Sequence, residues 1–170
     1  MPRVRLAVPA LLASALLLAA PLAAHAQGYP TKQVRLIVPL AAGSTADIVS
    51  RVVGAELSKS LGQAVVIENK TGAGGTIAMA EVARSEPDGY TISFASQGTL
   101  VFNQALYAKP GYDSLKDFQP LAFVGGVSNV MIVPAASTAK GPADVIAAAK
   151  AKPGELTFSS GGSGTSHHLS

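Results

Sequence analysis

An alternation of short apolar segments with amphipathic ones, between residues 34 and 94, limits the fold more than any other feature of this chain. Three segments are short, apolar and rich in β-branched residues, as buried strands are: residues 34–38, 64–67 and 90–94. Between them, residues 47–61 place apolar side chains every three or four positions and precede Gly62, which predicts an amphipathic helix with a glycine stop. Residues 77–84 predict a shorter helix. Alternating strands and helices with short connections are typical of a parallel sheet covered on both faces, so we expect an α/β fold.

The pattern changes in the second half of the chain. Two apolar runs, residues 121–124 and 130–133, flank a Gly-Gly pair, and we expect one long, bent segment that crosses between two lobes. A helix is predicted for residues 142–151, which begin with Pro, and a last strand for residues 156–159. Elements that only begin a second sheet cannot bury their apolar faces, so we expect a truncated chain whose second-lobe strands lack partners and are exposed. The predicted divisions are a signal peptide (1–26), an incomplete first α/β lobe (27–124), and a crossover with the start of a second lobe (125–170).

The first 26 residues have the pattern of a leader. Two arginines precede the apolar run 6–24, and the segment closes with the small-residue motif Ala-His-Ala at residues 24–26. These features predict a signal peptide that is cleaved after Ala26. The alternative is a retained membrane anchor, but Pro9 and Pro21 interrupt the span. We therefore expect export to the periplasm.

Composition excludes several functions. Of the 13 Lys and Arg, two lie in the leader, which leaves 11 against 10 Asp and Glu and no basic cluster. With few aromatic residues as well, the chain lacks the pattern of a nucleic-acid-binding protein. The chain contains no Cys, which rules out a lipid-anchored N-terminal Cys, thiol catalysis and Cys-zinc sites.

The loop that follows the first predicted strand has the strongest pattern of a binding site. Small residues there let a ligand approach the backbone, and the first amide groups of the following helix have no internal acceptors. An anion such as a carboxylate fits this position. Alternatively, Ser44 is only the N-cap and Asp47 only its capping-box partner, and the two roles can coexist. The candidate ligand-binding residues of this loop are Leu40, Ala42, Gly43, Ser44, Thr45 and Asp47.

Three other motifs fail as catalytic or cofactor sites. The Gly-rich loop 71–76 has Ile77 where a dinucleotide-binding motif needs Gly. The sequence around Ser163 has Thr165 where a nucleophile elbow needs Gly, and no acid and His follow it in the required order. His167 and His168 are adjacent and lack nearby acidic partners, so we expect no metal. We therefore expect no catalytic residues, no cofactor and no enzymatic activity.

Two further loops follow predicted strands at their carboxyl ends, where open α/β sheets bind ligands. Their hydroxyl and backbone groups suit carboxylate oxygens, and His167 could form a polar wall of the pocket. The candidate ligand-binding residues of these loops are Ser96, Thr99, Ser163, Thr165, Ser166 and His167.

An ordered set of motifs runs through almost all of the predicted mature chain. It comprises Tyr29-Pro30, the segment from Val34 through Pro39-Leu40-Ala41-Ala42-Gly43 to Asp47-Ile48-Val49, Leu61-Gly62-Gln63, Glu68-Asn69-Lys70-Thr71-Gly72-Ala73-Gly74-Gly75, Pro87-Asp88-Gly89-Tyr90-Thr91, Asn103 with Ala105-Leu106-Tyr107, residues 112–118, Ala151-Lys152-Pro153-Gly154, and Gly162-Ser163-Gly164-Thr165-Ser166-His167. Together these residues resemble the periplasmic solute receptors of tripartite tricarboxylate transporters, the Bug or TctC-like family.

The resemblance implies a periplasmic-binding-protein type II fold, the two-lobed Venus flytrap, of which this chain would hold the first lobe and the start of the second. It also implies a receptor for a small organic carboxylate, either a di- or tricarboxylate or an acidic amino acid. The implied partners are the permease subunits in the membrane, and the complete receptor is expected to be a monomer. Family members often have Gly-Gly where this chain has Gly43-Ser44, and they are roughly twice as long. The alternative function is a periplasmic ligand-sensing adaptor for a membrane signalling protein.

Overall fold

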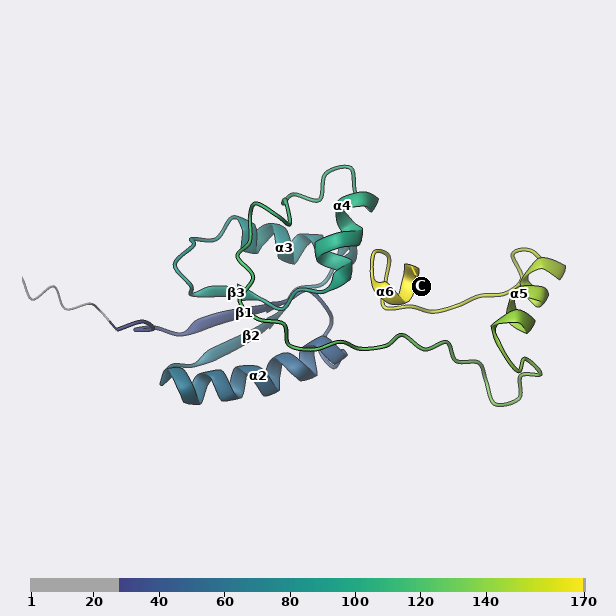
Figure 1. Ribbon diagram of the computed structural model, residues 1–170, viewed down its shortest axis with the longest axis horizontal. Coiled ribbons are helices and arrows are strands. Elements are labelled where there is room, and N and C mark those ends of the chain that lie inside the picture. Colours follow the sequence, from purple (N-terminus) through teal and green to yellow (C-terminus); the bar gives the residue numbers. More distant parts are fainter. Residues whose placement is uncertain (1–27, 170) are drawn as a thin grey trace, which may run out of the picture. The chain divides into compact units, whose positions relative to one another are not determined.

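The computed structural model describes residues 28–169 (Figure 1). The chain divides after Thr31 into two units, and all the elements below belong to the unit that begins at Lys32. The predicted signal peptide and its cleavage site lie outside the described residues. No helix within the described residues is both long enough and apolar enough to cross a membrane.

Three parallel strands form one sheet in the order β2-β1-β3. They are β1 (Val34–Val38), β2 (Val65–Asn69) and β3 (Thr91–Ser93), and Arg35 in the centre pairs with Val66 on one side and Thr91 on the other. Four of the five β1 residues are buried, because a central strand contacts helices on both faces. The predicted parallel α/β sheet is confirmed.

Helix α2 (Thr45–Leu61) packs against β1 and β2 and begins two residues before the predicted start. Gly62 ends it in the left-handed conformation, as predicted. Gly54 is buried against β2: a methyl group on it would lie 2.9 Å from Ile67 Cδ1, so the missing side chain lets the helix approach the sheet closely.

The opposite face of the sheet is covered by α3 (Thr76–Ala83), which follows η1 (Ala73–Gly75), a single turn of 3₁₀ helix (Figure 1). Met79 of α3 is buried, and its Sδ lies 3.5 Å from Ser93 Oγ of β3. A π-helical turn, η2 (Gly98–Phe102), and α4 (Asn103–Leu106) follow β3. Tyr112 is buried beside Met79 and packs edge to face on Phe118, with the ring centres 5.6 Å apart.

The second half of the chain has little regular structure. Helix α5 (Pro142–Ala151) forms with Pro142 in its first turn, as predicted, and α6 (Ser166–Leu169) ends the described chain. The strand predicted for residues 156–159 is wrong, since this segment is neither a strand nor buried. A strand is stabilised only when a neighbouring strand pairs with its backbone, and none of the described strands pairs with residues 156–159.

The apolar runs at residues 121–124 and 130–133 are also irregular rather than strands. The predicted exposure of residues 130–133 is confirmed, since Val130 is 81% and Ile132 86% exposed. Phe123 in the first run is also exposed, at 88%. Large apolar side chains therefore face solvent along this segment.

Candidate functional site

The loops after the three strands lie at one edge of the sheet, because parallel strands all end on the same side. They are residues 39–44, 70–75 and 94–97. A methyl group on Gly75 would lie 2.8 Å from Thr99 Cγ2 and 2.9 Å from Pro39 Cβ, so the chain segments after all three strands meet there. We call this arrangement the carboxyl-edge loops.

A segment distant in sequence joins the carboxyl-edge loops. A methyl group on Gly74 would lie 2.5 Å from the carbonyl oxygen of Ser163, and one on Gly98 would lie 2.7 Å from that of Gly164. Residues 162–165 thus pack against the loop that follows β2 and against the start of η2, directly after the loop that follows β3. The fold therefore brings together the three candidate binding loops that were predicted separately from the sequence, which are residues 40–47, 96–99 and 163–167.

The first loop ends in the predicted cap of α2. Ser44 Oγ accepts the N–H of Asp47 at 3.3 Å, and Asp47 Oδ2 accepts the N–H of Gly43 at 2.8 Å. The Gly43 N–H is therefore already hydrogen-bonded to Asp47. Gly43 has a φ of 82°, a value that glycine adopts readily. The amides of Thr45 and Ala46, in the first helical turn, have no intrahelical acceptor. They are the donors that this helix end can offer to an anion.

Arg51 was not anticipated as part of this loop. Its Nε and Nη2 lie 3.0 and 2.9 Å from the two carboxylate oxygens of Asp47, which is only 3% exposed. The Arg51 hydrogen bond and, next, the Gly43 amide lower the pKa of Asp47 to about 2. The carboxylate is thus ionised at neutral pH, and Arg51 offsets a charge that would otherwise repel an anion at the helix end. The signal in the sequence is the four-residue spacing of Asp47 and Arg51.

Asn69 connects this loop to the end of β2. Its Oδ1 accepts from Arg51 Nη2 at 3.2 Å, and its Nδ2 donates to the carbonyl oxygen of Leu40 at 3.0 Å. Of the other predicted residues here, Ala42 and Thr45 are exposed, and Leu40 is half-buried. The loop backbone is therefore fixed by side chains from two neighbouring elements.

Ser96 and Thr99 cap each other. The Ser96 N–H donates to Thr99 Oγ1 at 2.9 Å, the Thr99 hydroxyl donates to the Ser96 carbonyl oxygen at 3.0 Å, and the Thr99 N–H lies 3.4 Å from Ser96 Oγ. Thr99 is buried and Ser96 exposed. The Thr99 hydroxyl is therefore committed to its own loop, whereas that of Ser96 is accessible.

The candidate residues of the last predicted loop, residues 163–167, likewise include both buried and exposed side chains. Thr165 is buried and donates its hydroxyl to the Gly162 carbonyl oxygen at 2.6 Å, while Ser163 and His167 are exposed. Ser166 Oγ lies 3.4 Å from Asn129 Oδ1. Within residues 28–169, no three His, Asp or Glu side chains are grouped as a metal site requires.

Asn103 is a second residue that site prediction missed. It is completely buried, and its Nδ2 donates to the Gly74 carbonyl oxygen at 2.9 Å. The available signal is an amide side chain directly after the apolar run Leu100-Val101-Phe102, because a buried amide is tolerated only where it finds hydrogen-bond partners. Asn103 links α4 to the carboxyl-edge loops.

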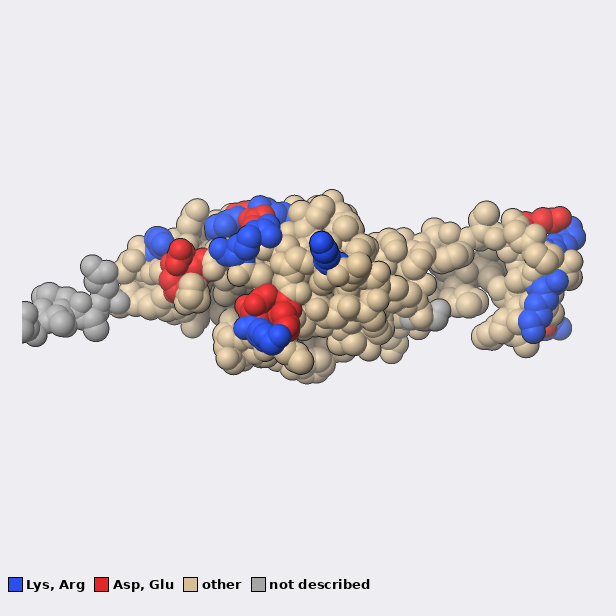
Figure 2. Space-filling model, turned by 90° about the horizontal axis from the view of Figure 1, so that it is seen from above, with Lys and Arg blue, Asp and Glu red and all other residues tan. Residues whose placement is uncertain are grey.

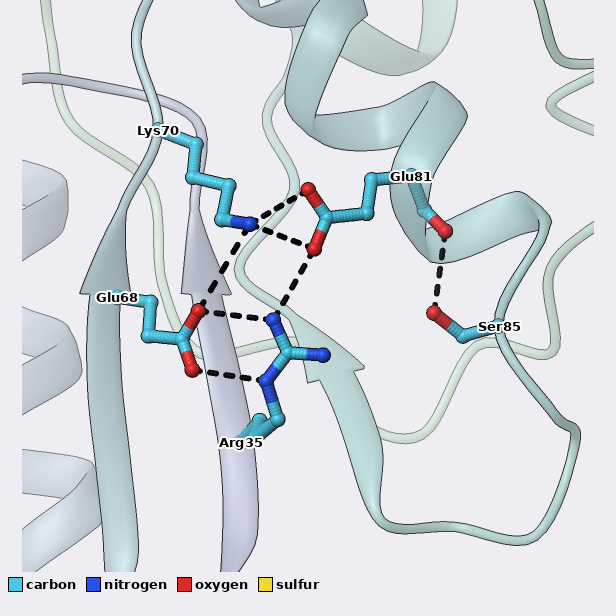
Figure 3. Close-up of polar contacts among 5 residues, drawn as sticks. All are labelled: Arg35, Glu68, Lys70, Glu81 and Ser85. Atoms are coloured by element: carbon cyan, nitrogen blue, oxygen red, sulfur yellow. Dashed lines mark hydrogen bonds and ion pairs between the residues drawn. The ribbon is translucent and has the colours of Figure 1, made fainter.

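Four charged side chains fix the start of the loop after β2 (Figure 3). Glu68 accepts from Arg35 Nε and Nη2 at 2.7 and 2.8 Å, and Glu81 of α3 accepts from Lys70 Nζ at 2.6 Å and from Arg35 Nη2 at 3.0 Å. The Arg35 hydrogen bonds are the largest cause of the lowered pKa of Glu68, and the Lys70 hydrogen bond is the largest cause of the lowered pKa of Glu81. We call these four residues the ion cluster; it holds Lys70 between the sheet and α3.

A separate hollow lies at the other end of the sheet. It has a volume of about 510 Å³ and is lined by residues at the amino ends of β1 and β3, including Gln33, Tyr90 and Thr91. Ligands of open α/β sheets bind beyond the carboxyl ends, so we place the site in the loops. On the face that Figure 2 shows, most basic side chains adjoin acidic ones, unlike the extended basic surface of a nucleic-acid interface.

Comparison with known proteins identifies the family. Residues 49–170 match the family described as "Tripartite tricarboxylate transporter family receptor". The chain belongs to this family. Among curated relatives, it is 35% identical to Protein BugT of Bordetella pertussis (strain Tohama I) over 153 residues, covering 89% of this chain and 46% of BugT. It is 39% identical to the UPF0065 protein in the gbd 5' region of Cupriavidus necator, covering 90% of this chain and 46% of that protein.

Solved structures confirm the fold of a periplasmic solute-binding protein. The structure titled "R. palustris Rpa4515 with adipate" is 38% identical, with a TM-score of 0.70 over 75% of this chain and 43% of that one. MatC from Rhodopseudomonas palustris with bound malate is 43% identical, with a TM-score of 0.52 over 54% of this chain and 31% of MatC. The periplasmic binding protein BugD is also 43% identical, with a TM-score of 0.52 over 54% of this chain and 30% of BugD. The chain spans 42–49% of the length of the curated relatives it matches.

Proposed function

We propose that this chain forms part of an extracytoplasmic receptor that captures a small organic carboxylate, either a di- or tricarboxylate or an acidic amino acid, for a tripartite tricarboxylate transporter. The observation that carries the proposal is the convergence of residues 162–165 with the carboxyl-edge loops, the first of which leads into the amino end of α2. The amides of Thr45 and Ala46 would receive a carboxylate there, because charge-assisted hydrogen bonds contribute roughly 1.5–3 kcal/mol each.

Family membership supports the ligand class. The related structures named above hold adipate and malate, which are both dicarboxylates. Delivery to permease subunits, a monomeric complete receptor and export through the signal peptide 1–26 belong to the same proposal. The division into lobes at residues 124 and 125 also stays a prediction.

Binding without catalysis fits the hydroxyl groups of the site. The hydroxyls of Thr99 and Thr165 donate to backbone carbonyl oxygens of their own loops, at 3.0 and 2.6 Å, rather than to a base. A nucleophilic hydroxyl needs a neighbouring base to take its proton. We therefore propose that the family's receptor role, and not an enzymatic one, applies to this chain.

The proposal is tested by calorimetry with malate, succinate, adipate, citrate and glutamate. The perturbation is Gly43→Val, with Gly62→Val as the matched control: both glycines have positive φ and open space around them, at opposite ends of α2. Valine is strained in either position, but only Gly43 adjoins the proposed donors. Gly43→Val should weaken binding at least about tenfold, equal to about 1.4 kcal/mol, and Gly62→Val should leave the affinity within about twofold.

Two results would contradict the proposal. One is the absence of binding heat with all five acids in the unmodified chain. The other is unchanged affinity in a folded Gly43→Val protein, which would remove the first loop from the site.

The variant Asp47→Asn separates the two possible roles of Asp47. If Asp47 only caps α2, the variant should retain most of the affinity, whereas if Asp47 orders the ligand, the variant should lose it.

A further inference from the structure

Asn103 is a buried amide side chain that uses only part of its hydrogen-bonding capacity. It is the first residue of α4 and is 0% exposed. Its Nδ2 donates to the Gly74 carbonyl oxygen at 2.9 Å, but its Oδ1 has no hydrogen-bond partner among the described residues. Buried polar atoms are nearly always paired, so an unpaired one requires an explanation.

The unpaired oxygen faces the contact between two loops. A methyl group on Gly164 would collide with Asn103 Oδ1, and one on Gly74 would lie 3.2 Å from the same oxygen and 2.5 Å from the Ser163 carbonyl oxygen. Both glycines have positive φ, 62° at Gly74 and 84° at Gly164, which favours glycine. Asn103 therefore lies where the loop 70–75 and residues 162–165 touch.

Asn103 also holds one of the two ends of the loop 70–75. At the start of the loop, Lys70 Nζ is held by Glu81 of α3 at 2.6 Å. At the other end, the Gly74 carbonyl oxygen is held by Asn103 of α4. The loop is thus attached at both ends to helices, and the surface that it presents to residues 162–165 is fixed in position.

We propose that Asn103 is a positioning residue that sets the spacing between the loop 70–75 and residues 162–165 for carboxylate capture. The role in capture rests on the proposed function; the spacing itself does not. The side chain is short and has only two rotatable bonds, so the hydrogen bond to Gly74 and the contact with Gly164 fix the two loops relative to one helix.

Hydrogen exchange measured by NMR tests the spacing without any ligand. The reporters are the amides of Gly75, bonded to the Gly72 carbonyl oxygen at 2.9 Å, and Thr165, bonded to that of Gly162 at 3.2 Å. In Asn103→Ala both should exchange at least about tenfold faster, while the β1 amides change by less than about twofold, because local opening is separable from global unfolding. The control is Gln104→Ala, which removes the adjacent but exposed amide side chain and should change neither reporter.

Uniform acceleration at all amides would assign Asn103 to general stability and overturn the proposal, as would unchanged exchange at Gly75 and Thr165. Asn103→Asp keeps the size of the side chain but places a carboxylate oxygen against the Gly74 carbonyl. It should also speed exchange at Gly75, and unchanged exchange in this variant would likewise overturn the proposal.

Calorimetry with malate and adipate supplies the functional arm. Asn103→Ala should weaken binding at least about tenfold and Gln104→Ala by less than about twofold. Unchanged affinity in a folded Asn103→Ala protein overturns the role in capture. If the unmodified chain binds neither acid, the proposed function fails, whereas the exchange experiment still decides whether Asn103 sets the spacing of the loops.

Discussion

Replacing Glu81 by Gln should destabilise the fold by about 1–2 kcal/mol at neutral pH. Glu81 accepts from Lys70 Nζ with both oxygens at 2.6 Å and from Arg35 Nη2 at 3.0 Å, with its side chain 32% exposed. Solvent-exposed ion pairs contribute roughly 0.2–1 kcal/mol each. Glu81 forms two pairs at a half-buried position, so we take the upper part of this range for each pair, which gives the total of about 1–2 kcal/mol. The neutral Gln loses the charge-charge attraction and leaves Lys70 with a weaker partner.

The pH dependence has a definite sign. The pKa of Glu81 is lowered in the folded state, chiefly by its hydrogen bond with Lys70, so its contribution to stability is complete above the ordinary value of 4.5. The contribution declines as the pH falls through 4.5 and on through the lower folded value, because protonation then favours the unfolded state. Glutamine cannot titrate. The stability difference between the unmodified protein and Glu81→Gln should therefore be largest at pH 7 and shrink towards pH 3.

Urea unfolding followed by far-UV circular dichroism measures this difference at both pH values. The matched control is Glu56→Gln, which breaks a pair with Lys59 on the exposed surface of α2, where the Glu56 side chain is 69% exposed. The control should cost less than about 0.5 kcal/mol. An equal cost for the two variants, or a cost for Glu81→Gln that is the same at pH 3 and pH 7, would refute the role assigned to the ion cluster.

Three further measurements follow from the structure. Ile37→Val should reduce the unfolding free energy by about 1 kcal/mol, because one fully buried methylene is lost, while Ile77→Val on the exposed face of α3 should change it by less than about 0.5 kcal/mol in urea unfolding. The exposed apolar run that contains Val130 and Ile132 should bind a hydrophobic dye, and changing both residues to Lys should reduce the fluorescence; an unchanged signal would contradict their exposure. Intact-mass measurement of exported protein should find the chain cleaved after Ala26, and exported protein that retains Met1 would show that prediction to be wrong.

The sequence was sufficient for features that depend on neighbours along the chain. The predicted helix start lay two residues too late, but the cap formed by Ser44 and Asp47 and the end at Gly62 were predicted, because a cap joins residues only three or four positions apart. The three strands were located by their apolar, β-branched composition, and their parallel arrangement followed from the helices between them. Neither inference required knowledge of distant contacts.

Only the tertiary structure decided which side chains fix the loops. Arg51 reaches Asn69 on β2, and Asn103 reaches Gly74 across 29 positions of sequence, so both roles depend on how the elements pack. The predicted strand at residues 156–159 failed for the same reason: its composition favours a strand, but a strand forms only beside a partner. Local patterns therefore determined the helices and the sheet, whereas long-range partners determined the loop geometry on which the proposed carboxylate site depends.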